Sequence, residues 1–176
     1  MSWMRTRSGR RVDLFDPDPA TIDLGDIAFA LSHQNRFNGH AGCYSVAEHS
    51  VRVSKVCASD PLAGLLHDAA EAYVGDLIRP LKAHLPGFDA IELRLQAAIG
   101  VALKVAPARF LTPAVIEADQ VLLATEKRDL MRDAADWGPL PPPLTEEIVP
   151  WNNWVRAHRL FVATYRYLIE QEAPAA

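Results

Sequence analysis

The chain has 176 residues, of which 49% are hydrophobic and 23% charged, values typical of a globular protein that folds as one domain. A formal net charge of −4 argues against a general nucleic-acid-binding protein. No apolar run reaches the roughly 18 residues that a membrane helix needs. We therefore expect a single domain over residues 1–176, with no membrane partner and no stable nucleic-acid partner. The charged N-terminus lacks an apolar signal region, and two cysteines without metal-type spacing favour a reduced, cytoplasmic setting.

The N-terminal arm, residues 1–20, contains the one local concentration of basic residues. Arg5, Arg7, Arg10 and Arg11 lie there within seven positions. Such a group either contacts an anion or forms a solvated basic arm, and the sequence leaves both interpretations open.

The next segments have helical patterns. Apolar residues recur at helical spacing over residues 21–32, and glycines interrupt the polar connector HQNRFNGHAG that follows. Ser45 and Glu48 have the spacing of a capping box, in which the serine and the glutamate each bond a free backbone N–H group. This pattern predicts a second helix from Ser45 to about Ala58.

Asp60 and Pro61 suit the N-cap and the first position of a third helix, which we expect to continue to Gly75. Later patterns predict a short turn at Pro80 and helices over residues 89–105, 112–132 and 151–171. The segment GPLPPPLTEEIVP, residues 138–150, is expected to be an extended, exposed proline-rich loop. No segment has a convincing period-2 alternation. The expected fold is therefore a compact all-α domain, a bundle of helices of unequal length.

The segment GLLHDAAEAYVGD, residues 64–76, places three ionisable side chains beside the apolar face of the third helix. His67 and Asp68 are adjacent, and Glu71 follows one helical turn later. Ionisable groups at such positions are costly unless something pairs with them. A divalent cation would satisfy all three, because imidazole and carboxylate groups are ligands for Zn, Fe, Mn and Co. A His-Asp pair alone is equally well explained by a histidine that is hydrogen-bonded within the core.

Two further residues favour the metal interpretation. His49 lies near the start of the second helix, in SVAEHSVRVS, and Asp119 lies among apolar residues in EADQVLLA. Each alone is more often a satisfied core or surface group. Together with His67 and Asp68 they place four ligand-type side chains on three helices, which favours one metal site.

The order H…HD…D on consecutive helices resembles the HD-domain metal-dependent phosphohydrolases. It is most similar to small bacterial 5'-deoxynucleotidases and to the related small phage deoxynucleotide triphosphohydrolases. The similarity extends from about Ile27 to Leu130 and is concentrated in NRFNGHAGCYSVAEHS, GLLHDAAEAYVGDLIRPLK and EADQVLLA. In the middle stretch HD-x-x-E, Gly-Asp and Pro-x-Lys fall at the family's offsets. The first 20 residues and the proline-rich loop do not match the family pattern.

The resemblance implies an HD-type helical bundle that binds one divalent transition metal ion, for which Zn, Mn, Co, Fe and Ni all remain open. The implied metal ligands are His49, His67, Asp68 and Asp119. Glu71 is implied as the catalytic carboxylate that activates or orients the attacking water, and Asp76 as an acidic group near the leaving oxygen. The alternative for Asp76 is a simple turn residue.

The resemblance also implies substrate-binding residues. Arg36 is expected to contact phosphate and Phe37 to lie against the sugar, where the relatives usually have Arg followed by Trp. The phenylalanine leaves the preference for deoxyribose open. Lys82 is expected to bind phosphate, or else to be an exposed charge, and its neighbour Arg79 could take the same role.

The expected function is hydrolysis of a nucleotide or another small phosphate ester, with deoxynucleoside 5'-monophosphates as the favoured substrates. One alternative is a deoxynucleoside triphosphate triphosphohydrolase that uses the same site, which the N-terminal arginines keep open. Another is a non-catalytic helical module in which a metal links the helices. A zincin protease is disfavoured, because HDAAE lacks the second histidine of H-E-x-x-H.

Other features are expected to be structural. The remaining histidines, His33, His40, His84 and His158, are interpreted as surface or structural residues. Trp137, Trp151 and Trp154 near the C-terminus suit either the core, which we favour, or a subunit interface. The sequence therefore leaves open whether the protein forms a homodimer or a higher homo-oligomer.

Overall fold

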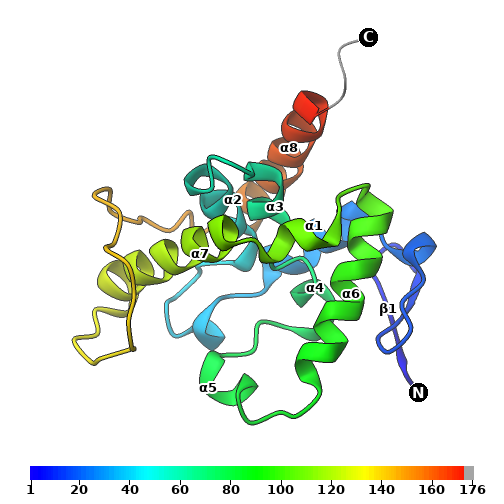
Figure 1. Cartoon of the computed structure of the whole chain (residues 1–176), viewed down its shortest axis with the longest axis horizontal. Coiled ribbons are helices and arrows are strands. Elements are labelled where there is room, and N and C mark those ends of the chain that lie inside the picture. Colours follow the sequence, from blue (N-terminus) through cyan, green and yellow to red (C-terminus); the bar gives the residue numbers. More distant parts are fainter. Residues whose placement is uncertain (173–176) are drawn as a thin grey trace.

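The computed structural model of the chain describes residues 1–172 and is mostly helical (Figure 1). Its helices are α1 (Leu24–His33), α2 (Val46–Val56), α3 (Pro61–Leu66), α4 (Glu71–Val74), α5 (Arg79–Lys82), α6 (Phe88–Leu103), α7 (Pro113–Glu126) and α8 (Trp154–Glu172). Two strands, β1 (Trp3–Arg5) and β2 (Arg11–Asp13), form an antiparallel hairpin. Short 3-10 turns cover Pro19–Thr21, Phe37–Gly39 and Pro107–Leu111, and a π-helical turn at Lys127–Met131 follows α7.

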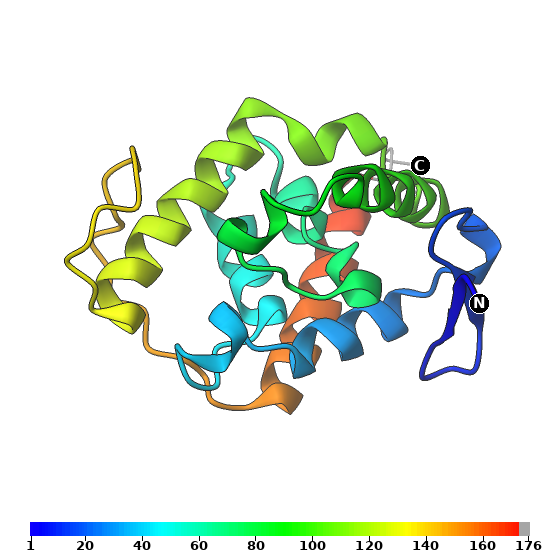
Figure 2. The ribbon, with the colours of Figure 1, turned by 90° about the horizontal axis from the view of Figure 1, so that it is seen from below.

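The centre of the molecule is formed by α2 and α3, which pack against each other and against α7 and α8. Figure 2 shows α2 between α7 on one side and α1 on the other. The largest fully buried side chains are mainly apolar, and they include Tyr44, Phe110, Phe161, Ile27, Leu31, Leu62, Leu65, Leu66, Leu95, Ile99 and Leu122. The imidazole of His49 is as completely buried as these residues. The fold therefore places an ionisable ring inside its apolar core.

The predicted starts of α2 and α3 are confirmed, with one correction, whereas α1 and α8 each begin three residues later than predicted, at Leu24 and Trp154. The Ser45 hydroxyl accepts a hydrogen bond from the Glu48 N–H at 3.1 Å, and the Asp60 carboxylate accepts one from Ala63 at 3.0 Å. However, the Glu48 side chain does not bond back to Ser45. It accepts hydrogen bonds from Arg52 and from the backbone N–H of Trp151, so it joins α2 to the segment before α8.

The prediction of one helix from Pro61 to Gly75 is wrong. The helix ends at Leu66, residues 67–70 form a turn, and a new one-turn helix, α4, begins at Glu71. The Glu71 N–H bonds the Asp68 carbonyl at 3.0 Å, three residues back. The His67 carbonyl instead accepts a hydrogen bond from the Gln96 side chain on α6 at 3.2 Å. At the break, a carbonyl group is thus satisfied by a contact with a helix that is distant in sequence. A local sequence pattern does not reveal such a contact.

The N-terminal arm is a β-hairpin, which corrects the all-α expectation. Its three-residue strands are too short to give a recognisable alternation in the sequence. The arginines there make structural contacts: the Arg7 guanidinium lies 3.7 Å from the centre of the Phe29 ring, and that of Arg11 lies 4.0 Å from the centre of the Trp3 ring. The Arg10 guanidinium donates hydrogen bonds to the carbonyl oxygens of Ala20 and Ile22, just before α1. The hairpin therefore packs on α1.

The proline-rich segment, residues 138–150, is extended as predicted but is not exposed throughout. Its Leu144 N–H bonds the Thr125 hydroxyl at 2.9 Å, and Ile148 is buried. The segment thus runs along the C-terminal end of α7. Of the three tryptophans, Trp137 and Trp151 are half-buried and Trp154 is exposed, so none lies fully in the core.

No helix within residues 1–172 has both the length and the apolar character needed to cross a bilayer.

Candidate metal centre

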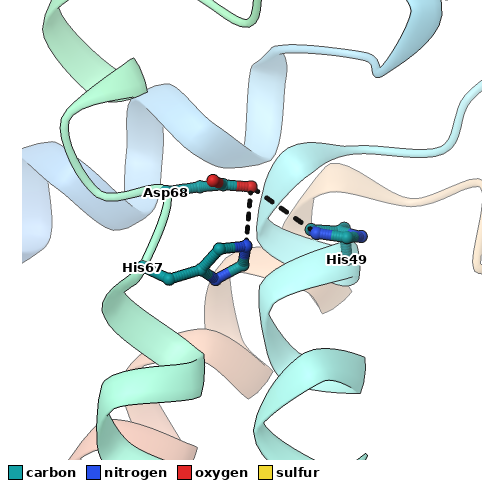
Figure 3. Close-up of side chains that lie close together, drawn as sticks. All are labelled: His49, His67 and Asp68. Carbon is teal, nitrogen blue, oxygen red and sulfur yellow. Dashed lines mark ion pairs between the residues drawn. The ribbon is translucent and has the colours of Figure 1, made fainter. Parts of the chain in front are cut away.

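The predicted metal ligands come from three parts of the chain that meet at one place. His49 lies in the first turn of α2, His67 and Asp68 lie in the turn between α3 and α4, and Asp119 lies on α7. Figure 3 shows the Asp68 carboxylate pointing at the imidazoles of both His49 and His67. Two of these four residues, His67 and Asp68, therefore lie in the turn that interrupts the helix after α3.

The distances between the four side chains are short. The Asp68 Oδ2 atom lies 3.1 Å from Nε2 of His67 and 3.5 Å from Nε2 of His49. The Asp119 Oδ1 atom lies 3.3 Å from Nε2 of His49 and 3.9 Å from Nε2 of His67. Each carboxylate thus directs one oxygen at both imidazoles. His49, His67 and Asp68 together form a group that could hold a metal ion.

The two imidazoles are oriented as metal ligands usually are. Nδ1 of His49 donates to the Glu126 carboxylate at 2.6 Å, and Nδ1 of His67 donates to the Gly64 carbonyl at 2.8 Å. These bonds fix which nitrogen of each ring faces the cluster. Both Nε2 atoms are buried and lack a hydrogen-bond partner among residues 1–172. Two orphaned imidazole nitrogens facing two carboxylate oxygens fit a divalent cation.

Glu126, the last residue of α7, was not identified from the sequence. Its side chain is completely buried, and its two oxygens have different partners. One accepts from His49, while the other accepts from Nε and Nη2 of Arg36 at 3.2 and 3.0 Å. Arg36 in turn directs Nη1 at Asp68, 3.7 Å away. A buried carboxylate thus links a predicted metal ligand to a predicted substrate-binding residue.

The cluster strongly perturbs the acidity of its own members. Burial and the Arg36 charge lower the pKa of His49, but Glu126 and Asp119 outweigh them and raise this pKa to about 9. Burial raises the pKa of Asp68, but His67 and His49 outweigh it and lower this pKa to about 2. The pKa of Asp119 is also lowered, because interaction with His49 outweighs burial. Carboxylates that stay ionised in a buried site attract a cation.

Two more acidic groups lie beside this cluster and behave in the opposite way. Burial and the neighbouring charges of Asp68 and Asp76 raise the pKa of Glu71 well above its usual range. Burial also raises the pKa of Asp76, with a further contribution from Asp68. The Glu71 Oε2 atom is buried without a hydrogen-bond partner in the described chain. Carboxyl groups with raised pKa values are candidates for general acids and bases.

A cleft of about 260 Å³ opens beside the cluster, between α5, α6 and α7. Its cationic side chains are Arg79 and Lys82. Arg79 donates to the Oδ2 atom of Asp119 at 3.0 Å, on the side away from the imidazoles, and Lys82 pairs with Glu92 on α6. The cleft thus includes the predicted Lys82, and it adds Arg79, which the sequence offered only as a substitute.

Arg36 and Phe37 lie on another side of the cluster and do not line this cleft. Arg36 is buried, and its Nε and Nη2 atoms donate to Glu126. Phe37 has a φ of 55°, in the left-handed region, and its ring centre lies 6.0 Å from that of Trp137. A strained backbone at this position is typical of sites under functional constraint.

The remaining histidines are structural or exposed, as expected. His33 bonds the Phe29 carbonyl at 2.8 Å and stacks against Trp154, with ring centres 4.4 Å apart. His84 bonds the Pro80 carbonyl at 2.9 Å. His40 is exposed and His158 is half-buried, and neither belongs to the cluster.

The fold and site define a mostly helical protein with a His-His-Asp group that could hold a metal ion, in which both histidines are buried. No family model matches the chain. It is 36% identical to the uncharacterized protein YfdR of Escherichia coli K12 over 142 residues, which cover 80% of this chain and 79% of YfdR. The chain belongs to the same family as YfdR. It is also 42% identical over 129 residues to an uncharacterized protein of Rhodobacter capsulatus, a match that spans 66% of this chain and 62% of that protein.

Proposed function

We propose that the protein is an HD-type metal-dependent phosphohydrolase that releases phosphate from deoxynucleoside 5'-monophosphates. One observation carries this proposal: the two buried, unpartnered Nε2 atoms of His49 and His67 face oxygens of Asp68 and Asp119. The family resemblance assigns the same four residues to the metal. A bound divalent ion would supply activation of water and neutralisation of charge on the phosphoryl group.

The protein's own residues would move the protons. In this proposal Glu71 accepts a proton from the attacking water as the water oxygen bonds to phosphorus. The ester P–O bond then breaks, and Asp76 gives a proton to the leaving oxygen. Burial raises the pKa values of both carboxyl groups, which is the direction of shift commonly found for carboxyl groups that act as general acids or bases.

Arg79 and Lys82 would contact the phosphate from the cleft, and the remaining Nη1 of Arg36 from the other side. Arginine suits this role because its planar guanidinium donates several hydrogen bonds at once. The Arg79 side chain is 59% exposed and keeps donors free beyond the bond to Asp119. Phosphoryl transfer depends mainly on such positioning and charge stabilisation.

The charges around the cleft favour a monophosphate over a triphosphate. Its lining includes four carboxylates, those of Asp68, Glu71, Glu92 and Asp119, against the two cations Arg79 and Lys82. Even with a divalent ion bound, this lining would provide little excess positive charge to attract a triphosphate. Three of the four N-terminal arginines that had kept the triphosphate open, Arg7, Arg11 and Arg10, contact Phe29, Trp3 and the chain before α1, respectively.

The test is phosphate release by the purified protein, freed of metal and reloaded separately with Mn, Co, Zn, Ni or Fe. Deoxynucleoside and ribonucleoside 5'-monophosphates and the deoxynucleoside triphosphates are the substrates, and the products are separated to distinguish orthophosphate from tripolyphosphate. We expect orthophosphate from the deoxynucleoside monophosphates. Absence of hydrolysis with every metal and substrate would contradict the proposal, and tripolyphosphate would support the triphosphohydrolase alternative.

The Glu71→Gln variant distinguishes a catalytic metal site from a metal site that only links helices. We expect the variant to bind metal as the wild type does but to turn over at least about 100-fold more slowly, because it lacks the proton acceptor. Bound metal is measured by elemental analysis and turnover by phosphate release. Glu170→Gln, which changes an exposed carboxylate on α8, is the control and should behave as the wild type. Unchanged turnover in Glu71→Gln would contradict the assigned role.

A further inference from the structure

One side of the cleft is apolar, although the cleft also contains the charged cluster. This apolar wall consists of Phe110, Leu111, Val115 and Ile116, from the 3-10 turn before α7 and from the start of α7. Phe110 and Val115 are buried and hold the backbone in place, whereas Leu111 and Ile116 are 53% and 44% exposed. Large exposed apolar side chains beside a polar cleft indicate a surface that another group covers.

The apolar wall lies at a defined place relative to the metal centre. Ile116 precedes Asp119 by three residues on α7, so the two side chains are neighbours on one helix face, with Cβ atoms about 5–6 Å apart. Arg79, which bonds Asp119, and Lys82 line the same cleft from α5. A phosphate ester bound by Arg79 and by a metal ion at Asp119 would therefore have its organic part near Ile116.

We propose that the apolar wall binds the organic part of the phosphate ester, and that this part is a planar ring system such as a nucleobase. This inference rests on the proposed function and assigns a specificity site that neither the motifs nor the relatives indicate. The wall offers aliphatic surface, so it recognises a ring by its apolar face. Recognition of this kind depends little on which base is present.

The charges in the cleft favour a small molecule over a second copy of the chain as the occupant. A protein surface that covered Leu111 and Ile116 would also cover the neighbouring Arg79, Lys82 and Glu92. Lysine and glutamate are depleted in protein interfaces because their desolvation is costly, which applies here to Lys82 and Glu92. A phosphate ester instead uses the charged and the apolar parts of the cleft together.

The experiment compares Ile116→Asn and Leu111→Asn with Val101→Asn. Val101 is 63% exposed on α6 and does not line the cleft, so it is a matched control. Deoxyadenosine 5'-monophosphate and inorganic phosphate are the two probes. Their Kd values are measured by calorimetry on Mn-loaded protein in the Glu71→Gln background, and KM for the nucleotide is measured in the otherwise wild-type protein.

We expect Ile116→Asn and Leu111→Asn each to weaken nucleotide binding and raise KM about tenfold, the loss that follows from replacing a buried aliphatic contact by a polar one. Inorganic phosphate should bind within about twofold of wild type, because it does not reach the apolar wall. Val101→Asn should change neither probe. This pattern would support the inference even if the bound nucleotide were not hydrolysed.

Three outcomes would overturn it. In the first, Ile116→Asn and Leu111→Asn bind the nucleotide as tightly as Val101→Asn does. This result would show that the ring does not lie on the apolar wall, and it would leave the proposed function intact. Dissociation of a wild-type oligomer by these variants in sedimentation, with unchanged nucleotide affinity, would assign the wall to a second copy. If the protein binds neither probe and hydrolyses no phosphate ester, both the proposed function and the inference fail.

Discussion

Glu126 shows how a single carboxylate organises the site at the scale of residues. Its oxygens bind His49 and Arg36 separately, and all three side chains are buried. The bond to Nδ1 orients the imidazole and makes it a better ligand, while the bonds to the guanidinium compensate for the burial of Arg36. The candidate metal centre and the Arg36 guanidinium are therefore both held in place by Glu126.

Glu126→Gln tests this shared role. The amide keeps the shape but removes the charge, so Arg36 and His49 lose their compensating partner. We expect metal affinity to fall about 10- to 100-fold and the free energy of unfolding to fall by about 3 kcal/mol. Calorimetric titration with Mn²⁺ and denaturant unfolding measure the two effects. Glu117→Gln, an exposed change on the same helix, should alter neither. Wild-type metal affinity in Glu126→Gln would show that this carboxylate does not support the ligand.

The sequence predicted the cluster of ligands but not the residues that hold it. His49, His67, Asp68 and Asp119 stand out because charged or polar side chains interrupt apolar patterns. Glu126 does not stand out, since it precedes the charged run Lys127–Asp129 and resembles an ordinary solvent-facing glutamate. Its burial depends on His49, 77 positions away, and such a contact has no local pattern.

At the scale of elements, the sequence located the two helix starts that have clear capping residues, but it did not locate the start of α1 or α8 or the extent of the third helix. The caps at Ser45 and Asp60 are local hydrogen bonds, which the sequence encodes directly. The break after Leu66 was not predicted, because residues 67–70 contain no glycine or proline. At the break the His67 carbonyl is satisfied by Gln96 on α6, a tertiary contact.

At Gly100, helix α6 closely approaches the chain that follows it, and a mutation can test how much this close contact matters for stability. It is buried in α6, and a Cβ atom there would lie 2.6 Å from the Val105 carbonyl oxygen and 2.7 Å from Cγ of Pro107. Gly100→Ala should lower the free energy of unfolding by about 1–2 kcal/mol, because overpacking outweighs the better helix propensity of alanine.

Denaturant unfolding measures the effect of Gly100→Ala. Val101→Ala, at the exposed neighbouring position, should stay within about 0.5 kcal/mol of the wild type. A more stable Gly100→Ala protein would mean that the chain after α6 moves aside at little cost.

At the scale of the whole molecule, the candidate metal centre joins segments that are distant in sequence. Residues from α2, from the turn after α3 and from α7 meet at one point near the middle of the fold. An ion there would bind the folded protein only, so it would stabilise the whole domain by mass action.

Metal removal should therefore destabilise the protein, and more so at higher pH. In the metal-free protein the pKa of His49 is raised from 6.5 to about 9, so this group contributes stability below pH 6.5 that is lost as pH rises through about 9. With an ion at about 1,000 times its Kd, we expect a gain of about 4 kcal/mol, or about 10 °C in Tm, over the metal-free protein.

Thermal unfolding of chelated and Mn-loaded protein at pH 6, 7.5 and 9 checks this expectation, and the difference in Tm should widen with pH. Asp119→Asn, which neutralises one ligand, is the control and should show little response to added metal. A difference in Tm that shrinks as pH rises would contradict the proton competition at His49.

The geometry of α7 limits the insertions and deletions that the chain can tolerate. Asp119 and Glu126 are seven residues apart, almost two turns, so both lie along one stripe of the helix. Inserting or deleting one residue between them would rotate one relative to the other by about 100°. Functional homologues should therefore keep this interval free of gaps, whereas the proline-rich segment that follows should vary in length.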